Sequence, residues 1–159
     1  SEYHGEYIMA AYNNLAGVYH KTMQYEASEK SMEKCFEYGY NPRYADRYNN
    51  TLLELNKYDK GLETTQKALV ALIPSFNSMN IKDNPSKEAV LDDDIEVITL
   101  LNYKSHFLCI KATTENLDEL LYQGIEVGEL GLHYLEQMNK RTNYSEYSHI
   151  IKNDYMLKL

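Results

Sequence analysis

The stretch Ala11-Tyr12-Asn13-Asn14-Leu15-Ala16-Gly17-Val18-Tyr19 places its apolar residues three and four positions apart. This spacing continues back to Tyr3 and marks one face of an amphipathic helix over residues 3–19. Further helices are predicted over residues 26–38, 42–55, 59–73, 92–113, 116–138 and 143–159, the last two opened by capping-box spacing at Asn116/Glu119 and Asn143/Glu146. With about seven helices and no convincing strand, the chain is expected to be all-α.

Composition agrees with this expectation. The 159 residues suffice for a single domain, and 7 Gly and 3 Pro are too few for the many tight turns of a β-sandwich. Tyrosine is unusually common, with 16 Tyr against 3 Phe and no Trp. Rigid amphipathic rings suit protein interfaces, and this role is expected for the tyrosines that cluster near helix ends, namely Tyr3, Tyr7, Tyr38, Tyr40, Tyr44 and Tyr48.

The first two helix pairs resemble each other when the sequence is shifted by 33 residues. The shift superposes Tyr25 on Tyr58, Tyr19 on Leu52, Ser28 on Gly61 and Cys35 on Ala68. Small residues therefore recur where two helices would cross closely, and large residues recur where side chains fill the space between helices. Such self-similarity indicates a stack of repeated helix pairs, each covering the apolar face of the next.

The spacing of Tyr12, Leu15, Ala16, Tyr19 and Tyr25 resembles that of a tetratricopeptide repeat, in which an aromatic, a leucine, a small residue and a tyrosine follow this order. The resemblance implies an all-α, right-handed solenoid of stacked antiparallel helix pairs, forming one domain over residues 1–159. Its parts would be repeat 1 at about 9–42, repeat 2 at about 43–74, a loop at 75–86, a longer helical hairpin at 87–140, and a terminal capping helix at 143–159.

In tetratricopeptide proteins the first helix of each pair lines a concave groove. Carried over to this chain, the resemblance places Asn13, Asn14, His20, Lys21, Arg43, Arg47 and Asn50 in a peptide-binding groove. Asparagine side chains supply a donor and an acceptor for a peptide backbone, and Arg or Lys can hold a carboxylate. Asp46 lies among these basic residues, and an ordinary solvated polar face remains an alternative interpretation.

Motifs for catalysis, metal or cofactor binding are weak. Only Glu146 and His149 have the Glu-x-x-His spacing, half of what a di-iron bundle needs. The acidic run Asp92-Asp93-Asp94 with Glu96 lacks the pattern of a calcium loop and is typical of a helix N-terminus. Cys35 and Cys109 are predicted to be free thiols within helices. No catalytic residue, metal or cofactor is therefore expected, and the protein is not expected to be an enzyme.

The chain carries 16 basic and 24 acidic residues, a formal net charge of −8. This charge disfavours nucleic acid as a partner, and no apolar run is long enough to cross a membrane. We expect a cytoplasmic protein whose partners are proteins or peptides, further copies of itself, or other domains of its own chain.

Three functions are compatible with these observations. The leading hypothesis is a non-enzymatic scaffold that binds a peptide or protein segment in its groove. A second is a regulatory or sensor repeat segment of a larger protein, upstream of a caspase-like peptidase or kinase domain. A third is a helical-bundle ligand carrier or enzyme that uses buried tyrosine hydroxyls to hold a polar ligand.

Overall fold

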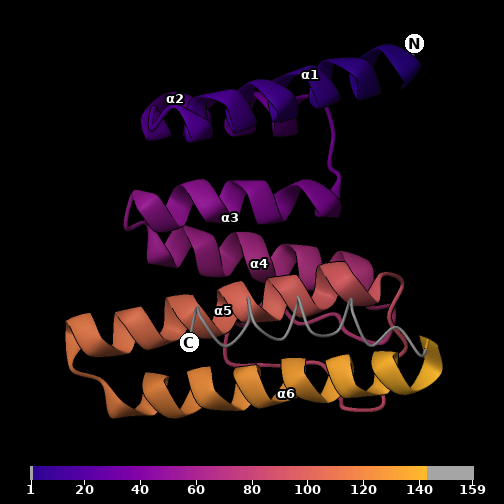
Figure 1. The fold of residues 1–159 in the computed structure, drawn as a ribbon, viewed down its shortest axis with the longest axis vertical. Coiled ribbons are helices and arrows are strands. Elements are labelled where there is room, and N and C mark those ends of the chain that lie inside the picture. Colours follow the sequence, from indigo (N-terminus) through magenta and orange to yellow (C-terminus); the bar gives the residue numbers. More distant parts are fainter. Residues whose placement is uncertain (1, 143–159) are drawn as a thin grey trace.

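The computed structural model describes residues 2–142, and this part of the chain is all-helical, as predicted. Figure 1 shows the helices in chain order along the long axis of the molecule. Their bounds are α1 Glu2–Lys21, α2 Tyr25–Glu37, the 3-10 helix η1 Pro42–Tyr44, α3 Ala45–Glu54, α4 Tyr58–Leu72, α5 Asp94–Glu115 and α6 Asp118–Thr142.

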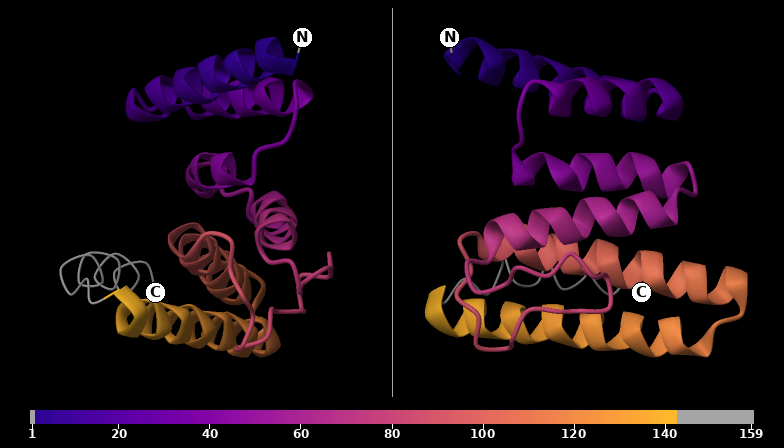
Figure 2. Two further views of the ribbon diagram at one scale, coloured as in Figure 1. Left: turned by 90° about the vertical axis from the view of Figure 1, so that its right-hand side faces the viewer. Right: turned by 180° about the vertical axis from the view of Figure 1, so that it is seen from behind.

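Consecutive helices pack against each other as antiparallel neighbours. The three pairs α1–α2, α3–α4 and α5–α6 follow one another down the molecule (Figures 1 and 2). The first helix of the middle pair, α3, also contacts α1 and α5, so the first helices of successive pairs touch. Side chains on α1, α3 and α5 can therefore contribute to one common surface.

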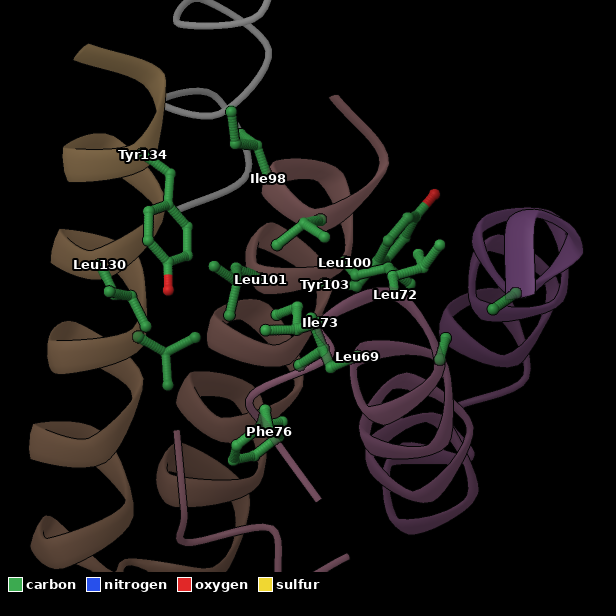
Figure 3. Packing of buried hydrophobic residues seen from close by; sticks show 14 of the residues in the cluster. Leu69, Leu72, Ile73, Phe76, Ile98, Leu100, Leu101, Tyr103, Leu130 and Tyr134 are labelled. Carbon is green, nitrogen blue, oxygen red and sulfur yellow. The ribbon is translucent and has the colours of Figure 1, made fainter. Parts of the chain in front are cut away.

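Helix α5 is the centre of the larger hydrophobic core. It contacts α3, α4 and α6 and buries Val97, Ile98, Leu100, Leu101, Phe107 and Leu108 completely. In Figure 3, Leu101 of α5 lies between Leu69 of α4 and Leu130 and Tyr134 of α6. A helix that is apolar around most of its circumference must be buried on most sides, and its neighbours α4 and α6 cover it.

The turn inside each helix pair has the same backbone conformation. Met23, Asn56 and Asn116 have left-handed φ values of 59°, 57° and 56°, and each lies two residues before the second helix of its pair. The following residues Gln24 and Lys57 also match, with φ/ψ of −93°/66° and −94°/66°. The turn therefore recurs with the 33-residue shift of the sequence between the first two pairs.

Ser28 and Gly61, two small residues that the 33-residue shift superposes, lie where one helix pair packs against the next. Ser28 of α2 is buried, and its Oγ lies 2.7 Å from Oγ1 of Thr51 on α3 and donates to the carbonyl of Ala16 at 2.9 Å. Gly61 of α4 lies directly against the ring of Phe107 on α5. A larger side chain at either position would separate two helices that now touch.

Three details differ from the sequence-based expectations. The loop predicted at 75–86 extends to Asp93, and the hairpin predicted from residue 87 has its first helix only from Asp94. Asn116 ends α5 in the left-handed conformation, with its backbone amide bonded to the Ala112 carbonyl, and α6 begins at Asp118. The predicted helix over 143–159, including Glu146 and His149, lies outside the described residues.

A buried lysine organises this long loop. Lys104 of α5 is completely buried, and its ammonium donates to Gln66 Oε1, the Asp83 carbonyl and Asn84 Oδ1, each at 2.8 Å. The amide of Gln66 in turn donates to the carbonyls of Ser78, Asn80 and Asp83. Burial lowers the pKa of Lys104 to about 8, partly offset by Asp83. Lys104 thus binds the loop backbone at the Asp83 carbonyl and also binds Gln66, whose amide binds the loop carbonyls of Ser78, Asn80 and Asp83.

Replacing Gly61 by Ala should destabilise the protein. The added Cβ would lie 2.4 Å from the Phe107 ring, and such overpacking costs about 1–3 kcal/mol. Urea unfolding measures the loss, and the double variant Gly61→Ala/Phe107→Leu should recover part of it. An unchanged midpoint for Gly61→Ala alone would contradict the close crossing of α4 and α5.

Replacing Lys104 by Met should lower the free energy of unfolding by roughly 1–3 kcal/mol, because the Asp83 carbonyl and the side-chain oxygens of Gln66 and Asn84 lose their donor. Amide exchange at Asp83, whose N–H bonds to the Asn80 carbonyl at 3.0 Å, should accelerate. Lys82→Met is the matched control, since the Lys82 side chain is exposed and forms an exposed ion pair with Glu119. Equal stability and equal exchange in the two variants would show that Lys104 does not hold the loop.

Candidate functional site

The candidate site begins on one face of α1. Asn13, Gly17 and His20 lie at helical spacings of four and three and so share a face. Asn13 is 9% exposed, and its Oδ1 has no hydrogen-bond partner within residues 2–142. Residues on this face of α1 contact α3.

His20 connects α1 to α3 by hydrogen bonds. Its Nε2 lies 3.2 Å from Nδ2 of Asn50, and its Nδ1 lies 3.4 Å from Oγ1 of Thr51. The ring also packs edge-on against Tyr25, with centroids 5.3 Å apart. The imidazole is half-buried and fixed from three sides, so it presents its remaining edge in a defined orientation.

Arg47 crosses from α3 to α1 through a space that only glycine leaves open. Its guanidinium lies over Gly17, where a Cβ would be 1.8 Å from Nη1. The side chain is therefore half-buried between the two helices. The planar, always charged guanidinium keeps donors for a carboxylate or a peptide carbonyl.

Arg43 extends the site to α5. Its Nε donates to Oδ2 of Asp93 at 3.0 Å, and its backbone N–H donates to the side chain of Asn41, which caps η1. The Asp93 side chain also accepts from the Glu96 amide at 3.1 Å and so caps α5, as expected for the acidic run. A carboxylate that binds Arg43 has to compete with Asp93.

Glu96 adds a partly buried carboxyl group beside this ion pair. Burial raises its pKa to about 8, helped by repulsion from Asp46 and Asp93 and opposed by Arg43. Its Oε1 is buried and has no hydrogen-bond partner in the described part of the chain. Glu96 is therefore mostly protonated at neutral pH, so it contributes a polar group without full charge.

A pocket of about 480 Å³ opens at the Arg43 end of this surface. It lies between the first half of α1 and the segment that joins α2 to α3. Its lining combines a carboxylate, a guanidinium, an amide and two phenol rings, from Glu6, Met9, Tyr40, Asn41, Pro42, Arg43 and Tyr44. Burial raises the pKa of Tyr40 to about 12, so its hydroxyl stays protonated and can donate a hydrogen bond.

The structure unites some of the predicted groove residues and separates others. His20 contacts Asn50, Arg47 packs on α1, and Arg43 binds Asp93, whereas Asn14 and Lys21 are exposed side chains at the border of this surface. Sequence reasoning missed Asp93, Glu96 and the pocket as parts of the site. The acidic run could have indicated them, had the partner of Arg43 been sought among carboxylates far along the chain.

Other predicted features concern metal, thiols and the membrane. Among residues 2–142, no three side chains of His, Cys, Asp or Glu converge as metal ligands. Cys35 and Cys109 are free, the first buried and the second half-buried. No helix within the described residues has the length and apolar character needed to cross a membrane.

Comparison with known proteins gives no match: no family model, no curated protein and no solved structure matches this chain.

The raised pKa of Glu96 predicts a pH-dependent stability. The folded chain keeps a proton that the unfolded chain loses near the ordinary value of 4.5, so the free energy of unfolding falls as pH rises from there to about 8. Glu96→Gln removes this dependence. Between about pH 5 and pH 8.5 the variant should gain about 1–2 kcal/mol relative to wild type, a value reduced for partial solvent screening.

Urea unfolding at both pH values measures this gain. Glu119→Gln is the control, because the Glu119 side chain is 73% exposed and the substitution should leave the pH dependence unchanged. A parallel pH dependence in wild type and Glu96→Gln would contradict the assignment.

Proposed function

We propose that this protein is a non-enzymatic interaction module that binds an extended peptide or protein segment across α1, α3 and α5. The observation that carries the proposal is the set of side-chain contacts that joins α1 to α3 and joins η1 to the start of α5. His20 meets Asn50, Arg47 lies over Gly17, and Arg43 meets Asp93. Side chains from separate helices are thus held at fixed positions along one surface, which suits recognition of a ligand longer than a single side chain.

We also propose that the helix pairs form a tetratricopeptide-like right-handed solenoid, with this surface as its concave groove. The recurring turn conformation at Met23, Asn56 and Asn116 supports a repeated unit. The contacts of Ser28 with Thr51 and of Gly61 with Phe107 support it further, since each small residue lies against the first helix of the following pair. In such a stack every pair covers the apolar face of its neighbour.

The side chains suggest how a peptide would be held. The Asn50 amide is half-buried and pairs through Nδ2 with His20, so its Oδ1 is the atom that can accept from a backbone N–H of the ligand, whereas the Oδ1 of Asn13 is buried. Arg47 and the exposed Lys21 are available for a ligand carboxylate. Arg43, already paired with Asp93, would exchange partners, so its contribution to affinity is smaller than an unpaired arginine would make.

The pocket beside Arg43 would discriminate between ligand peptides of different sequence. Its volume of about 480 Å³ accommodates a single large side chain, and the phenol rings of Tyr40 and Tyr44 provide apolar walls with polar tips. The regulatory alternative would use the same surface for another segment of a longer protein. It differs in the source of the bound segment and not in the chemistry of binding.

Peptides selected for binding to this chain from a random library provide the test. In fluorescence anisotropy, Arg47→Ala and Asn50→Ala should weaken a selected peptide at least about tenfold, because each removes a contact at the centre of the surface. The exposed Lys30 of α2 lies outside this surface, and Lys30→Ala is the control. Thermal unfolding of each variant verifies that it is folded.

Peptides that bind the Arg47 and Asn50 variants as tightly as wild type would contradict the proposed groove. Loss of binding in Lys30→Ala alone would place the interaction on the opposite side of the first helix pair.

A further inference from the structure

One side of α1 carries large apolar side chains that no described part of the chain covers. We name these residues the α1 strip, and they are Tyr3, Tyr7, Ala11, Leu15 and Val18. Tyr3 and Tyr7 are 74% and 76% exposed, Val18 is 58% exposed and Leu15 is 39% exposed. At 100° per residue this strip faces away from the side of α1 that buries Met9 and Ala16.

Exposed apolar residues scattered singly are ordinary, but a contiguous strip on one helix is typical of an interaction surface. We propose that the α1 strip is the interface through which two copies of this chain form a two-fold symmetric dimer. This proposal goes beyond the proposed function and does not depend on it, because the strip and the His20 side of α1 are different faces of the helix.

Charge is the argument for a second copy as the occupant. The protein has a net charge of −8, so two copies repel each other over most of their surfaces. The α1 strip itself contains no carboxylate, and the acidic residues of α1, Glu2 and Glu6, lie beside its N-terminal end only. Two such strips can therefore approach without bringing acidic side chains together.

The other exposed apolar patch fits a second copy poorly. It lies on α6 and consists of Leu121, Tyr122 and Ile125, each at least 41% exposed. Acidic residues surround it on the same helix, namely Asp118, Glu119, Glu126 and Glu129. Pairing two copies there would oppose like charges, which is destabilising.

The order of side chains along the strip favours antiparallel pairing. Bulky Tyr7 and Val18 lie on either side of the small Ala11 and the short Asn14, at equal distances from the midpoint between these two. In a two-fold arrangement about that midpoint, Tyr7 meets Val18 of the second copy and the small residues meet at the crossing. Small residues at a crossing let two helix backbones approach closely, and antiparallel helix dipoles attract each other.

Such a dimer would place Asn14 at the crossing, and it would leave His20, Arg47 and Asn50 of both copies accessible. Two equivalent surfaces in one particle can bind two segments of the same partner, which increases the overall affinity without any new contact.

The test is sedimentation velocity of the intact chain over a wide concentration range. Wild type should form a dimer as concentration rises. Val18→Glu and Tyr7→Lys should each raise the dissociation constant of the dimer at least about tenfold, because each buries an unpaired charge at the interface. Both side chains are exposed in the single chain, and circular dichroism should confirm that both variants fold.

Mixing Val18→Glu with Tyr7→Lys should restore the dimer, since antiparallel pairing places the new glutamate opposite the new lysine. The matched control is Ile125→Glu on α6, which should dimerise as wild type does. A chain that stays monomeric at all concentrations overturns the proposal. Dissociation by Ile125→Glu but not by Val18→Glu, or failure of the mixture to recover the dimer, overturns it as well.

Discussion

The buried ammonium of Lys104 is the constraint on which the second half of the molecule depends. The segment from Ile73 to Asp93 joins α4 to α5 without regular structure, so its backbone groups lack the partners that a helix supplies. Lys104 and Gln66 provide these partners from the two helices that the segment connects. The cost of burying a cation is visible in its lowered pKa, and three hydrogen bonds at 2.8 Å offset that cost.

This arrangement fixes where α5 lies, and α5 in turn positions the far end of the candidate site. Asp93 ends the loop and caps the helix, while its second carboxylate oxygen reaches Arg43 beside α3. Asp93 is thus the residue at which the loop, α5 and the candidate site meet.

Electrostatics divide the surface into regions with different roles. The polar surface across α1, α3 and α5 contains both signs of charge, already paired in part, which favours selective and reversible binding over strong attraction of any anion. The second helices of the first two pairs have their own compact network, in which Lys57 and Lys60 bind Glu29 of α2 at 2.6 and 2.8 Å. These ion pairs lower the pKa of Glu29 against the effect of its burial and hold successive helix pairs together.

Much of the fold could be predicted from local pattern, because helix periodicity and turn residues act over a few positions. The helices before the long loop were predicted to within a few residues, and the small residues Ser28 and Gly61 proved to lie at helix crossings, as the 33-residue shift indicated. Asn116 shows the limit of such reasoning. Asparagine suits both a helix start and a left-handed helix end, and only packing of α5 against α6 selects between them.

The sequence by itself determined that the chain is all-α, where its early helices begin and end, and which residues repeat, since these properties depend on neighbours along the chain. Only the tertiary structure decided that Lys104 is buried, that Arg43 pairs with Asp93 and that the pKa of the Glu96 carboxyl group is raised. Each of these involves residues tens of positions apart, and burial changes the energy of a charge far more than any local pattern reveals.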